Sequence, residues 1–318
     1  MKAFVTLIRS EFIEHRGGQF WTPMVVGALL LLLVVVGTFL NGSAVISLEV
    51  NDSGGVQIRT VGDIYDAVRA EKGETKAAPI LQAMAYGSAY FYLLPATLIA
   101  LIVSFFMLLS SMNAERVDRS ILFWKSMPVS DFKVVLAKFV AATFGTLLIA
   151  VTISIAVTLI AMALASVGGP FRASPEWQLV TSLPVLLGTF ATLMTACVFY
   201  VGWAAPVYGW IMLASAWAPR SALLYVVIPP VALAIFEALT FHSDYLWQEI
   251  ASRLGFESLG LGFALGEQVL ERAALAELLQ GQVGQMAAST ISLRFVAGLA
   301  VAALFLWAAS EVRRRRSV

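Results

Sequence analysis

The chain has 318 residues, of which 59% are hydrophobic and 13% carry charge, and its formal net charge is +1. Soluble domains are about half apolar and a quarter charged, so this composition excludes an ordinary soluble protein and indicates an all-α polytopic membrane protein. The single cysteine, Cys197, excludes an intramolecular disulfide and a cysteine-based metal cluster. Because Cys197 falls within an apolar run, we expect a core thiol at this position.

Residues 1–20 are too polar to span a bilayer. Phe4, Ile8 and Phe12 recur every four residues, and basic side chains fall on the opposite side of the same helix. This pattern predicts a helix lying in the plane of the membrane interface, although Glu11 interrupts its apolar side. A plain cytoplasmic tail is the alternative.

Several stretches reach the length of about 20 apolar residues that a transmembrane helix needs. The first is too long for the apolar core of a signal peptide, which is roughly 7–15 residues. A further uncharged stretch, residues 201–219, could cross the membrane, re-enter it or lie along its surface. The six predicted spans are residues 22–40, 90–112, 134–167, 179–200, 221–239 and 291–310.

The distribution of Lys and Arg predicts the topology. They concentrate in residues 1–20 and 113–138 and in the arginine run 313–316, although the polar segments 41–86 and 241–290 are longer. The positive-inside rule then places both termini in the cytoplasm and makes 41–86 and 241–290 two sizeable extracytoplasmic loops. An even number of spans follows, so we interpret 201–219 as an inner-surface or re-entrant helix.

The sequence lacks the motifs of the common catalytic sites. It has no P-loop, so this chain does not bind ATP in that manner. The two histidines, His15 and His242, fall on opposite sides of the membrane in the predicted topology, so they cannot share a metal ion. Glu237 is the one ionisable residue well inside a predicted span, where a charge costs roughly 2.5–3.5 kcal/mol at the centre. It is either functional or a carboxylate that reaches the outer interface or pairs within the bundle.

Residues 113–131 form a charged island between two long uncharged runs. We interpret it as a short helix outside the bilayer that offers an aromatic face to a partner protein and ends before Pro128. A solvated loop with an interfacial tryptophan is the alternative. The residues expected to bind the partner are Glu115, Arg116, Asp118, Arg119, Ser120, Ile121, Phe123, Trp124, Lys125 and Pro128.

The island also carries a resemblance to a known family. Glu115-Arg116, Phe123-Trp124-Lys125-Ser126 and Pro128-Val129-Ser130, followed by Lys138, resemble the connection between spans two and three in permease subunits of the ABC-2 family of ABC exporters. Met127 stands where the family pattern has Leu. The likeness covers nearly the whole chain, because the N-terminal helix and the six predicted spans also fit.

The resemblance implies a permease of the bacterial inner membrane that pairs with a second copy or a paralogue. Two separate ATPase subunits would bind ATP and magnesium, and this chain would need no cofactor of its own. Residues 113–131 would be the coupling helix seated in a groove of the ATPase, with Phe123 and Trp124 as anchors. The bilayer and these subunits are the expected partners, and no nucleic acid is expected. The alternatives are a non-transporting platform or sensor of the same architecture and, less favoured, an intramembrane enzyme.

Overall fold

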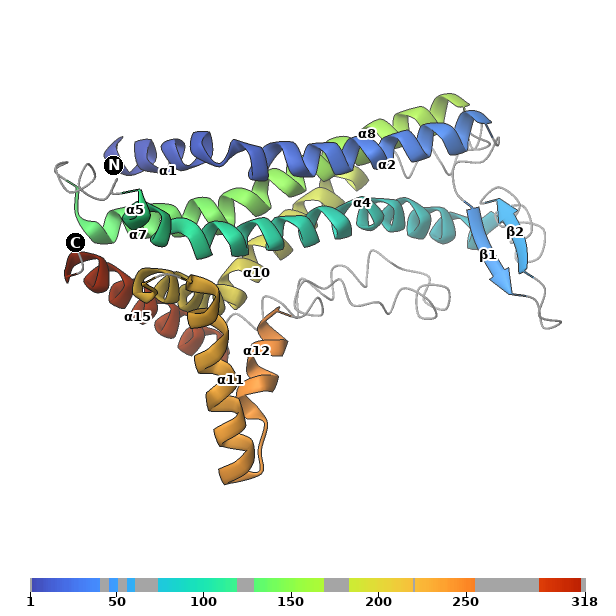
Figure 1. The fold of residues 1–318 in the computed structure, drawn as a ribbon. Coiled ribbons are helices and arrows are strands. Elements are labelled where there is room, and N and C mark those ends of the chain that lie inside the picture. The colour runs from blue at the N-terminus through green and yellow to red at the C-terminus, as the bar shows by residue number, and fades with distance from the viewer. Residues whose placement is uncertain are drawn as a thin grey trace.

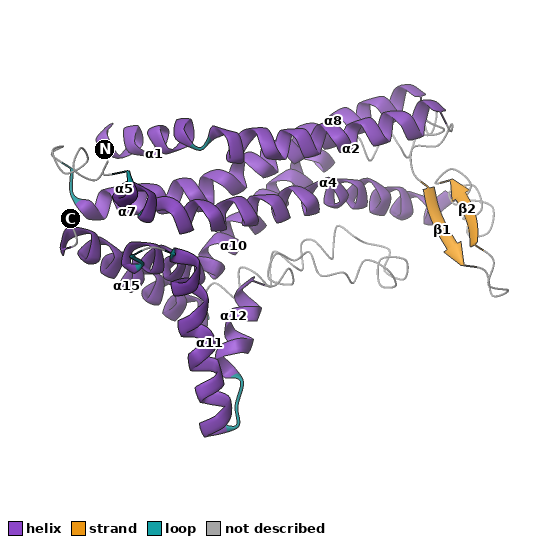
Figure 2. Cartoon of the chain, viewed as in Figure 1, coloured by secondary structure: helices purple, strands orange, loops and turns teal. Residues whose placement is uncertain are grey.

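The computed structural model describes residues 2–40, 46–50, 56–60, 74–118, 129–168, 183–219, 221–254 and 292–315. Within these ranges the chain is helical apart from one small sheet, and both chain ends lie at the same end of the helix bundle (Figures 1 and 2). The chain is a multi-pass helical membrane protein, as its composition predicts. Five helical stretches are long and apolar enough to cross a membrane, namely Pro95–Val117, Asp131–Leu164, Met194–Trp217, Ala222–Phe241 and Leu293–Arg315.

The N-terminal segment is helical, as predicted. Helix α1 (Lys2–Glu14), the π-helical turn η1 (Gly17–Trp21) and helix α2 (Thr22–Leu40) follow one another along a single line (Figure 1). The apolar side of α1 packs against helix α7 (Asp131–Val140), where Leu7 lies with Val134 and Ala137. Part of the apolar stripe that suggested a membrane surface therefore contacts protein, and the interfacial placement of α1 stays a prediction.

The first predicted outer loop, residues 41–86, contains more structure than expected. Strands β1 (Ile46–Val50) and β2 (Val56–Thr60) pair antiparallel, with Ile46 opposite Thr60. Helix α4 (Glu74–Ser111) begins inside the predicted loop and continues through the predicted second span, and the short helix α5 (Asn113–Val117) follows it. The loop prediction followed polarity, which does not distinguish a polar helix end from a loop.

Helix α7, the π-helical turn η2 (Ala141–Gly145) and helix α8 (Thr146–Gly168) together cover the predicted third span. Helix α10 (Leu183–Trp217) then continues without a break through Pro206. The separate re-entrant or surface helix predicted at 201–219 is therefore wrong, since most of it belongs to the candidate span Met194–Trp217. Proline is tolerated within membrane helices when neighbouring groups compensate the lost hydrogen bond.

The last described helices are α11 (Ala222–Phe241), α12 (Tyr245–Leu254) and α15 (Leu293–Arg315). Helix α11 leaves the bundle steeply and α12 returns towards it, whereas α15 runs back along α10 to the end where the chain starts (Figure 1). At Gly209 of α10 an added Cβ would lie 3.3 Å from the carbonyl oxygen of Ala302 in α15, so the two helices approach closely there. The main core lies between α4, α7, α8, α10 and α15.

Candidate functional site

A network of buried ion pairs joins four helices at the end of the bundle that holds both termini. The Lys138 Nζ in α7 lies 2.7 Å from a Glu11 carboxylate oxygen in α1 and 3.2 Å from Glu115 Oε1 in α5. All three side chains are nearly inaccessible, with at most 8% of each exposed. The structure places the Lys138 ammonium group between two carboxylates.

The same network continues to the C-terminal helix. The Arg313 Nη1 in α15 donates to Glu115 Oε2 at 2.7 Å, and its Nε donates to Asp131 Oδ1 at 3.0 Å. Glu115 therefore lies between Lys138 and Arg313 and pairs with both. A buried charge is tolerated when it is paired and hydrogen-bonded. The three carboxylates and two cations leave a formal charge of −1, and Asp131, the most exposed of the five, is partly open to solvent.

Arg116, the neighbour of Glu115, binds the C-terminal end of α10. Its Nη2 donates to the carbonyl oxygens of Ser215 and Ala218 at 2.6 and 3.0 Å. These are among the last carbonyls of α10 and have no partner further along that helix, and a cation near a helix C-terminus also favours the helix dipole. The Glu-Arg pair of the motif thus fastens α5 to α7, α15 and the end of α10.

Next to this network the two π-helical turns are bridged by a buried glutamine. The Gln19 Nε2 in η1 donates to the Ala141 carbonyl and to Thr146 Oγ1, both at 3.0 Å. A π-turn displaces the regular hydrogen bonds of a helix, and the glutamine satisfies a carbonyl where that displacement occurs. Phe12 lies so close to Gly145 that an added Cβ would collide with its ring.

The predicted partner-binding residues divide into two groups. Glu115, Arg116 and Asp118 are described, and the first two have the internal contacts given above, whereas Asp118 follows α5 and is exposed. Their part in binding a partner stays a prediction. The remaining predicted residues lie outside the described residues, namely Arg119, Ser120, Ile121, Phe123, Trp124, Lys125 and Pro128.

Sequence reasoning missed the pairing of Glu11, Asp131 and Arg313 with the motif residues. Two signals point to it. Glu11 interrupts an otherwise apolar stripe, and Lys138 stands alone at the entry to an uncharged stretch. A charge that breaks such a pattern is expected to have an opposite charge facing it, because an unpaired one would be costly.

Glu237 has a structural role at the far end of α11. Its carboxylate accepts hydrogen bonds from the Ser243 hydroxyl at 2.8 Å, from the Tyr245 backbone N–H at 2.9 Å and from the Leu246 backbone N–H at 3.0 Å. These amides open α12, so Glu237 caps that helix from the preceding one. Between the two helices His242 adopts a left-handed conformation, with φ of 53°.

Helix α12 is fastened to the bundle by Arg253. Its guanidinium donates to the carbonyl oxygens of Trp203 at 2.9 Å and Arg294 at 3.2 Å, pairs with Glu249 at 2.7 Å and lies 4.9 Å from the centre of the Trp203 ring. An added Cβ at Gly298 would collide with this guanidinium, so the glycine leaves room for Arg253 to lie against α15. Glu249 also pairs with Arg294, and hydrogen bonds from Arg294 and Arg253 hold the pKa of Glu249 below its ordinary value of 4.5.

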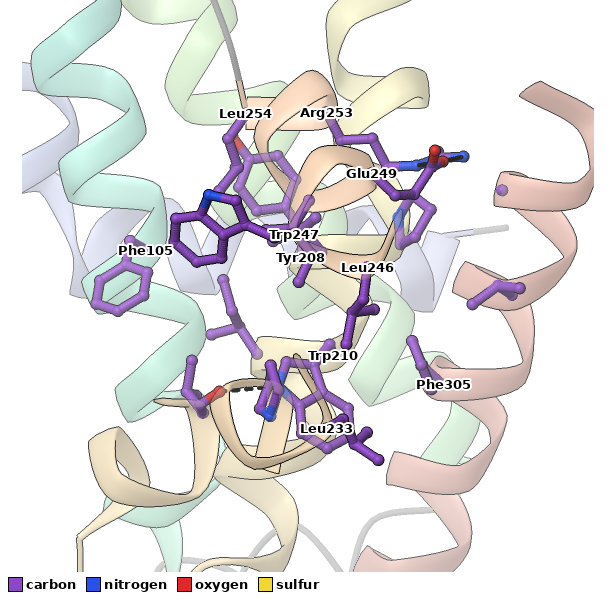
Figure 3. A pocket seen from close by; sticks show the side chains of 18 of the residues that line it. Phe105, Tyr208, Trp210, Leu233, Leu246, Trp247, Glu249, Arg253, Leu254 and Phe305 are labelled. Carbon is purple, nitrogen blue, oxygen red and sulfur yellow. Dashed lines mark hydrogen bonds and ion pairs between the residues drawn. The ribbon is translucent and has the colours of Figure 1, made fainter. Parts of the chain in front are cut away.

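A cavity of about 800 Å³ lies between this α11–α12 hairpin and helices α4, α10 and α15. Phe105 and Phe305 stand on opposite walls, and the pair of Glu249 and Arg253 marks one end (Figure 3). At the other end the Trp210 indole N–H donates to the Val226 carbonyl at 3.1 Å. Pro230 lacks the N–H that would bond this carbonyl in a regular helix, so the tryptophan replaces that bond.

The described residues contain one cluster with the spacing of a metal site, formed by Glu11, Glu14 and His15. Glu11 is already paired with Lys138, so the cluster does not offer three free ligands.

No family model, curated protein or solved structure matches this chain.

Proposed function

We propose that this chain is the permease subunit of an ATP-driven ABC exporter and moves its substrate outward across a bacterial inner membrane by alternating access. Two separate ATPase subunits bind and hydrolyse ATP with magnesium, and a second permease copy or a paralogue completes the transporter. In this proposal α2 and the five candidate spans form six crossings, and both termini are cytoplasmic.

The observation that carries the proposal is the buried ion-pair network at the two ends of the 113–131 connection. Glu115 precedes the central part of this connection, and Asp131 and Lys138 follow it. Through Glu11 and Arg313 the same network reaches α1 and α15. A displacement of the connection would therefore be transmitted to four helices, because paired buried charges resist separation.

This arrangement suits a chain whose energy comes from another subunit. Closure of the ATPase pair would pull on residues 119–128, and the network would pass the movement to the spans. In this proposal Phe123 and Trp124 provide the apolar anchors of the contact with the ATPase, and Arg119 and Lys125 set the orientation of that contact. In this proposal Glu115 and Lys138 belong to the motif because they transmit the movement through the network, and Arg116 because it holds α5 to the end of α10.

The proposal is tested by purifying the chain from its native host in a mild detergent. We expect a P-loop ATPase to copurify in a stoichiometric amount and to be lost from the Trp124→Ala variant. A matched control is Trp307→Ala, which removes an exposed tryptophan of α15 outside the 113–131 connection. Purification of the wild-type chain without any ATPase would contradict the proposal, as would undiminished copurification with Trp124→Ala and Phe123→Ala.

A further inference from the structure

The cavity beside α12 has the chemistry of a site for an amphipathic molecule. Most of its lining is apolar and comes from four of the candidate spans, including Leu101, Val231 and Val301. Its volume of about 800 Å³ lies within the roughly 300–1,000 Å³ of small-molecule sites. A water-soluble ligand would leave its polar groups without partners along these walls, whereas a hydrocarbon chain would not.

The polar end of the cavity has an excess of positive charge. Among the described residues that line the cavity, Glu249 is the one acidic side chain, and it pairs with two arginines, Arg253 and Arg294. The Arg253 guanidinium is nearly buried and its hydrogen bonds to Trp203, Arg294 and Glu249 occupy it. Arg294 is more than half exposed, and its Nη1 makes no hydrogen bond to a described residue. This end is therefore complementary to an anion.

Polar groups also lie deeper in the cavity. Tyr200 and Tyr208 line it, both are buried, and their hydroxyls interact with each other. Within such a pair only one O–H can donate to the other oxygen, so the second O–H would favour a ligand that carries an acceptor at this depth. The ester carbonyl of a lipid is such an acceptor, because it lies between the headgroup and the acyl chain.

We propose that this cavity binds one anionic phospholipid taken from the bilayer, with its headgroup phosphate at Arg294 and an acyl chain between α4, α10, α11 and α15. The exposed apolar side chains of α11, which forms one wall, face the hydrocarbon from which the lipid would enter. Binding of the lipid does not depend on the proposed exporter function. If the lipid is also the transported substrate, that role rests on the proposed exporter function and names its substrate class.

The test compares lipid retention by native mass spectrometry. The detergent-purified full-length chain is incubated with dioleoylphosphatidylglycerol or with dioleoylphosphatidylcholine. We expect the wild type to retain one phosphatidylglycerol in preference to phosphatidylcholine. Arg294→Gln should weaken the retention of phosphatidylglycerol about tenfold, the size expected for losing one charge-assisted contact, and Arg294→Lys should restore part of it.

A second pair of variants tests the acyl-chain position. Val231→Trp fills the cavity and should prevent retention of either lipid, whereas Ile228→Trp places the same ring on an exposed part of α11 outside the cavity lining. Equal retention by these two variants, equal retention of the two lipids by the wild type, or no retained lipid at all would overturn the proposal. Lipid retention without a copurifying ATPase would leave this site standing and contradict the exporter function.

Discussion

The Arg313 Nη1 donates to the Glu115 carboxylate at 2.7 Å, although 198 positions separate the two residues in the sequence. The contact joins the last helix to the start of the cytoplasmic connection proposed here. Lys138 and Asp131 lie on either side of it, so neither charge of the pair is left alone in the interior. The two described ends of the connection, residues 113–118 and 129–131, are therefore held by contacts within the chain.

Loss of Arg313 should destabilise the protein strongly. Arg313→Met removes the guanidinium and leaves Glu115 and Asp131 without one of their partners, a change that typically costs about 3–5 kcal/mol for a buried pair. We expect a clearly lower thermal unfolding midpoint, measured by the helical circular dichroism signal in detergent. Arg315→Met is the control, because Arg315 is exposed and its one ion pair among the described residues is with Glu311 on the same helix. Equal midpoints for the two variants would contradict the structural role of Arg313.

Glu11 and Lys138 should show coupled effects. Replacing either one alone leaves a buried charge with fewer partners, whereas replacing both removes the pair together. We expect the double variant Glu11→Gln/Lys138→Met to be less destabilised than the two single variants combined, by about 0.5–3 kcal/mol. The measurement is a double-mutant cycle of thermal or denaturant unfolding. Purely additive effects would mean that the 2.7 Å contact between α1 and α7 contributes nothing to stability.

Gly145 should not tolerate a larger residue. Gly145→Ala would bring a methyl group into collision with the Phe12 ring, and relief of such overpacking typically costs about 1–3 kcal/mol. Gly17→Ala is a matched control, because a Cβ at this other π-helical glycine would meet no atom within 4 Å. We expect a lower unfolding midpoint for Gly145→Ala alone and a partial recovery when Phe12→Leu is added. If adding Phe12→Leu did not raise the unfolding midpoint of Gly145→Ala, the destabilisation would not be caused by collision with the Phe12 ring.

The docking of α12 should depend on pH in a defined direction. Arg294 and Arg253 hold the pKa of Glu249 below 4.5, so the ionised carboxylate stabilises the fold. This stabilisation is complete above the unfolded pKa and is lost as the pH falls through the lower, folded value. We expect the difference in unfolding midpoint between wild type and Glu249→Gln to be constant above pH 4.5 and to shrink below it. A difference that shrinks well above pH 4.5 would contradict this linkage.

The sequence predicts the helical membrane class because length and the absence of charge are sufficient signals for a span. It does not predict that the helix through Pro206 continues. A proline in an apolar stretch is compatible with a kinked helix and with the end of a helix, and the sequence does not distinguish the two. It also does not predict the packing of α1 against α7, since an apolar stripe on a helix does not reveal whether protein or lipid covers it.

The charged motif illustrates the same distinction at the level of the site. Glu115, Arg116 and Lys138 are recognisable as important from their pattern, but their partners are not. Glu11 and Arg313 lie more than one hundred positions away from the residues they contact. Pairing across such distances follows from the packing of the helices, and a single sequence carries no direct record of it.

The measurement that tests the central proposal most directly is photo-crosslinking at the connection. A photoreactive amino acid at position 124 should form a covalent adduct with a P-loop ATPase in membranes of the native host. The same amino acid at position 228, an exposed position of α11, should form no adduct with that ATPase. An adduct at 124 alone is the result that the exporter proposal predicts. Its absence at 124, with the chain present in the membrane in normal amount, would contradict the proposal that an external ATPase drives this protein.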